Sequence, residues 1–150
     1  MKAFALILVS FGFLMGPTGF GQDAQGDKEK IQGTWKIVSF EARGKTKLLP
    51  PDALKNSKIV FTADKMTFHF GKEITEVGFK LDPGKKPKTI DMIDMKEKDV
   101  KPVPGIYLLE GDDIKLCWDA NCESRPTEFT KDGKRPQDLR LVVLKREKKK

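Results

Sequence analysis

Residues 31–41 read IQGTWKIVSFE, and this stretch decides the fold. Gly33 stands two residues before Trp35, and residues 35–40 are rich in the aromatic and β-branched side chains that favour strands. Apolar side chains occur on both faces of this strand, as expected where a strand lies between a core and a covering segment. A tryptophan at the mouth of the first strand is suited to plug one end of a small antiparallel barrel. The stretch therefore predicts a closed, all-β fold sealed by Trp35.

Seven later segments also have the composition or the alternation of strands. Several of the links between them are only two or three residues long, such as residues 111–113, and links this short join antiparallel neighbours. Eight strands in meander order close well into a barrel with little helix, because closure removes the exposed edges. A β-sandwich is the alternative architecture. The expected strands are residues 35–40, 57–62, 66–70, 73–81, 88–95, 104–110, 114–118 and 139–146, and residues 51–55 are expected to form one helical turn.

Residues 1–21 have the pattern of a secretory signal peptide. A positive start is followed by an almost wholly apolar run over residues 3–15, and small residues at Gly19 and Gly21 match the positions that a signal peptidase reads. The apolar run is shorter than the roughly 20 residues of a spanning helix, so cleavage is favoured over an uncleaved anchor. We expect an exported protein, periplasmic or extracellular, with no transmembrane segment after cleavage.

The remaining chain has the length of one domain. We expect residues 22–30 to be a disordered lead-in with at most a short helical turn, residues 31–147 to form the barrel, and residues 148–150 to be a basic tail. The chain carries a formal net charge of +7, but its basic residues form no run with interleaved aromatic residues. The charge therefore predicts no nucleic-acid partner, and we expect a monomer.

The chain has two cysteines, Cys117 and Cys122. An even number in an exported chain favours a structural disulfide between them. Two unbridged thiols are the first alternative, and redox or metal chemistry is the second. The four intervening residues differ from the two of the redox motif, and His69 is the one histidine of the chain, so few metal ligands are present. The sequence predicts neither a metal nor a cofactor.

The tripeptide Gly33-Thr34-Trp35 resembles the opening strand of lipocalins and the wider calycin group. The resemblance implies that the tryptophan closes the barrel base and that a basic side chain of the final strand lies across it. Arg140 and Arg146 are the candidates for this cation–π contact, which contributes about 0.5–2 kcal/mol. Longer segments resemble a family of small exported domains in planctomycete bacteria that has no assigned biochemical function. These segments are IQGTWKIVSFEARGK, FKLDPGKKPKTIDM, GIYLLEGDDIKLCW, SRPTEF and LVVLKRE.

An exported barrel predicts a non-catalytic binding or structural module of the bacterial cell envelope. Its inward side chains either hold a small apolar ligand or simply fill the interior. A macromolecular partner bound by the loop 119–136 or by the basic tail is the alternative, and a hydrolase is a remote one, because no nucleophile motif accompanies His69. The expected inward residues are Ile37, Phe61, Met66, Phe68, Phe70, Phe79, Ile106, Leu108 and Leu116, and the candidate ligand-binding residues are Phe68, Phe70, Phe79, Arg125 and Glu128.

Overall fold

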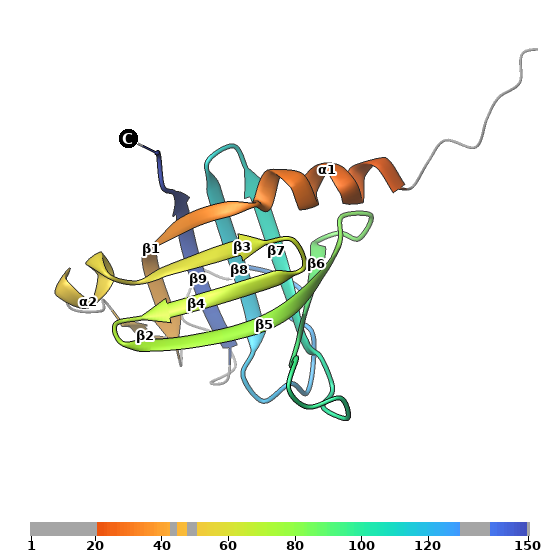
Figure 1. Ribbon diagram of the computed structural model, residues 1–150. Coiled ribbons are helices and arrows are strands. Elements are labelled where there is room, and N and C mark those ends of the chain that lie inside the picture. Colours follow the sequence, from red (N-terminus) through yellow and green to blue (C-terminus); the bar gives the residue numbers. More distant parts are fainter. Residues whose placement is uncertain (1–20, 43–44, 48–50, 130–138, 150) are drawn as a thin grey trace, which may run out of the picture.

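The computed structural model describes residues 21–42, 45–47, 51–129 and 139–149. Two helices lie in this part of the chain, and neither is long and apolar enough to cross a membrane. The helix α2 is the helical turn expected at residues 51–55. The elements are α1 (Gly21–Ile31), β1 (Gly33–Ala42), β2 (Lys45–Lys47), α2 (Pro51–Lys55), β3 (Lys58–Thr62), β4 (Lys65–Phe70), β5 (Glu73–Asp82), β6 (Lys88–Ile93), β7 (Val103–Glu110), β8 (Asp113–Asp119) and β9 (Leu139–Arg146) (Figure 1).

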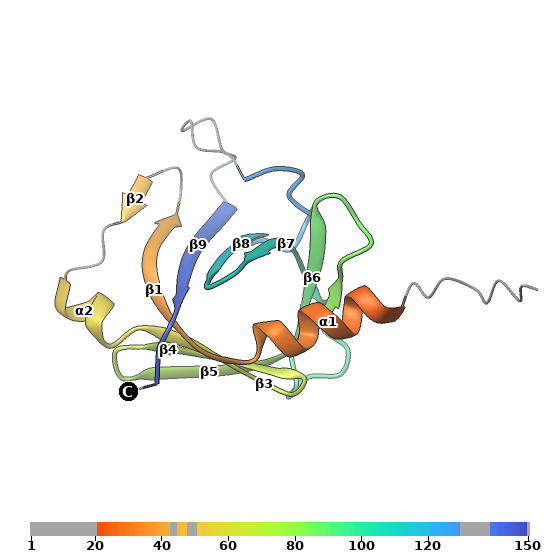
Figure 2. The ribbon, with the colours of Figure 1, turned by 90° about the horizontal axis from the view of Figure 1, so that it is seen from above.

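Eight of the strands form a closed antiparallel barrel. They follow the order β1-β3-β4-β5-β6-β7-β8-β9, and β9 then pairs with β1, so the sheet closes on itself (Figure 2). The short strand β2 pairs with the last three residues of β1. The eight segments expected to be strands are these eight, so the predicted barrel is confirmed and the sandwich alternative is wrong.

A β-bulge in β1 explains why apolar side chains lie on both faces of that strand. The register between β1 and β9 shifts between Ile37 and Ser39, and an extra residue at such a shift changes the face on which later side chains lie. Trp35 and Phe40 are five residues apart and would face opposite sides of a regular strand. With the bulge, both pack on the interior, while Val38 is turned outward and is 51% exposed.

Apolar side chains from all eight barrel strands fill the interior. On β7, the interior residues are Val103, Tyr107 and Leu109, whereas Ile106 belongs to a smaller cluster on the outside of the barrel. The expected inward direction of Ile106 and Leu108 is therefore wrong. Residues 106–109 are all apolar or aromatic, so alternation alone could not show which side chains point inward. In the observed orientation, Tyr107 points inward and its hydroxyl donates a hydrogen bond to Asp27 of α1.

The predicted disulfide is also wrong, because no bond joins Cys117 and Cys122. Cys117 is buried in the outer cluster between β7 and β9. Cys122 lies in the turn after β8, in a left-handed backbone conformation with φ of 58°. The carboxylate of Asp119 shapes this turn by accepting hydrogen bonds from three backbone amides, those of Asn121, Glu123 and Ser124.

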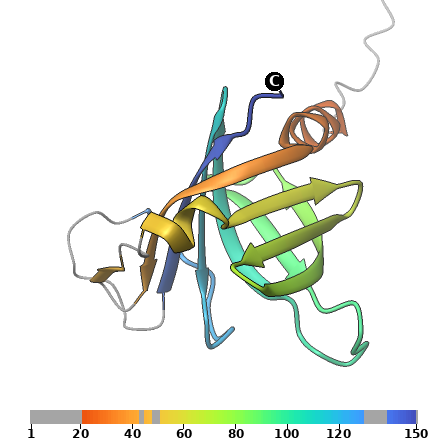
Figure 3. The same ribbon diagram turned by 60° about the vertical axis from the view of Figure 1, so that its left-hand side comes forward.

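Residues 22–30 form most of helix α1, so the expected disordered lead-in is wrong (Figure 3). The helix leads into β1 and is held by tertiary contacts. Ile31, its last residue, is fully buried in the barrel core, and Asp27 is 8% exposed. Packing of this kind stabilises helices whose own propensity is weak. Of the expected leader, residues 1–21, residues 1–20 lie outside the described residues, and Gly21 is the first residue of α1.

Candidate functional site

One end of the barrel is sealed by Trp35. Its indole is fully buried, and its Nε1 donates a hydrogen bond of 2.8 Å to the carbonyl oxygen of Ile31, where α1 ends. The guanidinium carbon of Arg146 lies 4.1 Å from the centre of the Trp35 ring system, within cation–π range. Of the two arginines that the sequence offers for this position, Arg146 occupies it and Arg140 lies elsewhere.

Arg146 also binds the end of α1. Its Nη1 donates to the carbonyl of Gln32 at 2.9 Å, its Nη2 donates to the carbonyl of Lys30, and its Nε lies 3.3 Å from Oδ1 of Asp112. A cation here suits the negative end of the helix dipole. Gly33 has φ of +116°, and a Cβ at this position would lie 3.3 Å from Nη1 of Arg146. A glycine before the tryptophan therefore provides both the backbone conformation and the space for the arginine.

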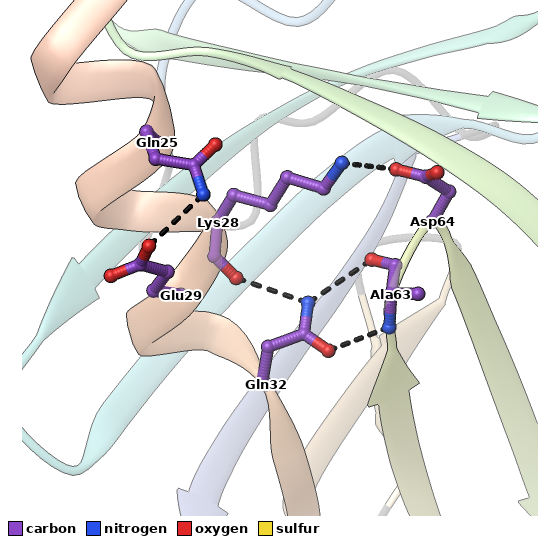
Figure 4. A network of polar contacts seen from close by, with 6 residues as sticks. All are labelled: Gln25, Lys28, Glu29, Gln32, Ala63 and Asp64. Atoms are coloured by element: carbon purple, nitrogen blue, oxygen red, sulfur yellow. Dashed lines mark hydrogen bonds and ion pairs between the residues drawn. The ribbon is translucent and has the colours of Figure 1, made fainter.

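Gln32 and Lys28 attach α1 to the turn between β3 and β4 (Figure 4). The Gln32 amide donates to the carbonyls of Lys28 and Ala63, at 3.0 and 3.1 Å, and accepts a hydrogen bond of 2.7 Å from the Ala63 amide. The ammonium of Lys28 pairs with the carboxylate of Asp64. These contacts fix the helix against the barrel wall at its sealed end.

Asp27 connects α1 to the interior. Its Oδ2 accepts hydrogen bonds from the Tyr107 hydroxyl at 2.7 Å and from the Lys88 ammonium at 2.8 Å. Burial acts to raise the pKa of Asp27, but the hydrogen bonds from Lys88 and Tyr107 and the charges of Lys88 and Lys30 outweigh it, so the pKa lies below its ordinary value. Burial, followed by the contact with the Asp27 carboxylate, raises the pKa of Tyr107. The two shifts keep Asp27 ionised and Tyr107 protonated, which are the states that the hydrogen bond between them requires.

At the opposite end, buried and half-buried aromatic side chains line an open pocket of about 320 Å³, which we call the aromatic pocket. The ladder register shows that Trp35 and Arg140 lie at opposite ends of the barrel. Arg146 of β9 lies across from Trp35, whereas Arg140 of β9 lies across from Ala42. The lining is mostly aromatic and apolar, with one charged side chain. The residues are Phe40, Phe68, Phe70, Thr75, Val103, Trp118, Ala120 and Arg140.

The aromatic rings of this pocket contact one another. Phe70 stacks on Phe68 with ring centres 6.2 Å apart and meets Phe40 edge-on at 6.1 Å, and Phe68 lies 6.4 Å from Trp118. The structure therefore brings together two of the three phenylalanines expected to bind a ligand. The sequence reasoning missed Phe40, which needs the bulge to face inward, and Trp118, which shares the face of Leu116 and could have been found by alternation.

Phe79, the third phenylalanine, lies outside the aromatic pocket. It packs edge-on against Phe61 in the core, with ring centres 5.3 Å apart. It also borders a groove of about 750 Å³ between α1, the turn before β4 and strands β5 and β6. Two lysines of that groove are paired with carboxylates, Lys28 with Asp64 and Lys65 with Glu76, so its charges are already balanced in part.

Arg140 gives the aromatic pocket its one cation. Its guanidinium donates a hydrogen bond of 3.3 Å from Nη1 to the carbonyl of Leu139. Among the described residues, no carboxylate forms an ion pair with it. A guanidinium beside four aromatic rings can donate hydrogen bonds to an anionic or hydrogen-bond-accepting group of a bound molecule.

Arg125 and Glu128 are not brought to the aromatic pocket. Arg125 spans β6 and β7 from outside, donating to the carbonyls of Gly105 at 2.8 Å and Ile90 at 3.3 Å and pairing with Asp91 at 2.6 Å. Glu128 is exposed. Arg125 therefore acts as a clamp between two strands, and residues 130–136 of the loop 119–136, which is expected to bind a partner, lie outside the described residues.

The described residues contain no group of three His, Cys, Asp or Glu side chains placed to hold a metal ion. His69 is half-buried on β4, on the face turned away from the core residues Met66 and Phe68. Comparison with protein-family models, with curated proteins and with solved structures finds no match to this chain. The planctomycete resemblance therefore stays a prediction, and the case for a function rests on the geometry of the barrel itself.

Proposed function

We propose that this barrel is a non-catalytic binding module that holds one small, largely apolar molecule in the aromatic pocket. The observation that carries the proposal is a pocket of about 320 Å³ with four aromatic side chains at the barrel end opposite Trp35. Ligand pockets typically occupy roughly 300–1,000 Å³ and are mainly apolar with a few polar groups, so this one suits a small ligand.

The side chains that line the aromatic pocket also indicate the chemical class of the ligand. Aromatic rings such as Phe70 and Trp118 favour flat or bulky apolar bodies, through offset-stacked and edge-on contacts. Arg140 favours an acidic group at one end of such a body, because a charge-assisted hydrogen bond is stronger than one between neutral groups. We therefore propose an amphipathic ligand with an apolar body and one anionic group.

The setting that we propose is the bacterial cell envelope, with the protein exported and monomeric. The pattern of residues 1–21 and the resemblance to small exported planctomycete domains support it. We propose no cofactor and no catalytic residue, since the aromatic pocket presents binding surfaces in place of a nucleophile with a base.

Two fluorescent probes test the proposal, because they differ by one sulfonate. N-phenyl-1-naphthylamine is neutral, and 8-anilino-1-naphthalenesulfonate adds the anionic group to nearly the same body. We expect saturable binding of both, and Phe70→Ala should weaken both about tenfold, as expected for the loss of an aromatic contact of roughly 1.5 kcal/mol. Arg140→Gln should weaken the sulfonate about tenfold and leave the neutral probe nearly unchanged.

Phe129→Ala is the matched control, because Phe129 is also half-buried but packs on the outer cluster. It should leave the affinity for both probes unchanged. Folded protein that binds neither probe, or equal losses in Phe70→Ala and Phe129→Ala, would refute the proposed pocket. Equal losses for both probes in Arg140→Gln would refute the preference for an anionic group.

A further inference from the structure

Three lysines lie directly opposite one another on the outside of neighbouring strands. Lys36 of β1 is the ladder partner of both Lys58 of β3 and Lys145 of β9. Residues opposite each other share a face, and like charges placed this way destabilise a sheet. We call Lys36, Lys58 and Lys145 the lysine row. The fold does not need this arrangement, since uncharged side chains would be accommodated in the same outward positions.

The charges of the lysine row are poorly balanced. Lys36 forms an ion pair of 3.5 Å with Glu147, and both side chains are largely exposed, so the pair is weak. In the part of the chain that the structure describes, Lys58 and Lys145 form no ion pair, although Asp113 is the other ladder partner of Lys145. The row therefore presents a net positive charge to whatever lies against it.

A groove of about 670 Å³ adjoins the lysine row. More lysines line it, namely Lys55 of α2 and Lys148 and Lys149 after β9. The amide of Glu147 donates to the carbonyl of Thr34 at 2.9 Å, which holds the chain just before Lys148 against β1. Lys148 and Lys149 thus follow a residue that is hydrogen-bonded to the barrel. Lys55 forms an ion pair of 3.9 Å with Asp52, but both side chains are exposed, so the pair is weak and the groove keeps its positive charge.

Apolar side chains lie among these lysines. Val38 and Leu54 both line the groove, and Val38 is 51% exposed because the β-bulge turns it outward. A soluble polyanion would require the lysines but gain little from an exposed valine. A lipid bilayer offers phosphates to the lysines and an apolar boundary to the valine, so the combination matches an anionic bilayer surface.

We infer that the lysine row and its groove form a docking surface for the surface of an anionic lipid bilayer. The lysines contact the lipid phosphates, and Val38 enters the boundary between headgroups and acyl chains. None of these residues lines the aromatic pocket, so the inference is independent of the proposed ligand. A barrel docked in this way would hold its ligand next to the membrane.

Co-sedimentation of the full chain with vesicles tests the inference. Phosphatidylcholine vesicles with phosphatidylglycerol provide the anionic surface, and vesicles of phosphatidylcholine alone provide the neutral one. The neutral vesicles also measure any apolar binding by residues 1–20, which can then be subtracted. The combined substitution of Lys36→Gln, Lys58→Gln and Lys145→Gln should weaken binding to the anionic vesicles about 100-fold, since each lysine near such a surface contributes about 1 kcal/mol. Added salt should weaken the binding of the unchanged protein.

Two controls are needed. The first distinguishes an effect of the lysine row from an effect of net charge, and the second distinguishes a lipid surface from a soluble polyanion. Lys96→Gln, Lys98→Gln and Lys101→Gln together remove the same charge from exposed positions between β6 and β7, and should have a much smaller effect. Val38→Ser should weaken vesicle binding about fivefold and leave binding of inorganic polyphosphate unchanged. Equal losses in the two triple variants would overturn the inference. So would a Val38→Ser variant that binds anionic vesicles like the unchanged protein, which would indicate a soluble polyanion as the partner.

Discussion

Arg146 makes three kinds of contact with one guanidinium. It lies over the Trp35 ring, donates to two carbonyls at the end of α1 and pairs with Asp112. Gly33 provides the space that this side chain needs. The glycine and tryptophan near the start of β1 thus depend on a residue at the end of the last strand, 113 positions from Gly33.

The substitution Arg146→Gln removes the cation and most of its hydrogen bonds. We expect it to lower the free energy of unfolding by about 2–3 kcal/mol, because a cation–π contact and hydrogen bonds from a charged donor are lost together. Urea denaturation measures this change. Arg140→Gln is the matched control on the same strand and should change the stability by less than about 0.5 kcal/mol. Equal effects would show that Arg146 has no special role in sealing the barrel.

At the scale of elements, α1 is the feature whose existence depends most on the rest of the fold. Its sequence, GQDAQGDKEKI, is polar except at its end and has no apolar stripe, and isolated helices of this length are marginal in water. Its contacts are made with residues far along the chain, such as Tyr107, 80 positions after Asp27. No pattern within residues 22–30 could show these contacts.

Asp27 anchors α1, and the substitution Asp27→Asn tests this anchor. We expect a loss of about 1–3 kcal/mol of unfolding free energy at neutral pH, because a buried carboxylate that accepts two hydrogen bonds is replaced. Urea denaturation as a function of pH measures it. Asp64→Asn removes an exposed pair at the same helix and should cost at most about 1 kcal/mol.

The pH dependence of stability follows from the directions of the two pKa shifts. Because the pKa of Asp27 is lowered on folding, its contribution is complete above the unfolded value of about 4 and is lost as the pH falls through the lower folded value. Because the pKa of Tyr107 is raised, its contribution is complete below about pH 10 and is lost as the pH rises through the folded value. Asp27→Asn should remove the part of the stability loss at acid pH that comes from Asp27. If the free energy of unfolding fell with decreasing pH as steeply in the variant as in the unchanged protein, the assigned contact would be contradicted.

At the scale of the whole molecule, the strands and most of the inward side chains were predictable, whereas the bulge, the inward face of β7 and the helix α1 were not. Alternation such as that of Met66, Phe68 and Phe70 is local, so the eight strands and their meander order could be predicted from the sequence. The bulge at Val38, the choice of Tyr107 over Ile106 and the helix α1 depend on contacts across the barrel, which one-dimensional patterns do not contain. Two of the three phenylalanines that line the aromatic pocket, Phe68 and Phe70, follow from alternation, whereas Phe40 requires the bulge.

The two ends of the barrel differ in what fills them. One end contains Trp35, Arg146 and α1, and the other contains the aromatic pocket with Arg140. The chain has two tryptophans, and the structure places Trp35 at the sealed end and Trp118 at the pocket. Each end therefore carries its own spectroscopic reporter.

The most direct measurement is a titration of ¹⁵N-labelled protein with N-phenyl-1-naphthylamine, followed through the two indole N–H signals by NMR. The Trp118 signal should move saturably as the pocket fills. The Trp35 signal should stay in place and exchange slowly with solvent, because its N–H donates to the carbonyl of Ile31 inside the sealed end. A Trp35 signal that moves as far as that of Trp118, or a Trp118 signal that never moves, would contradict a barrel with one sealed end and one binding end.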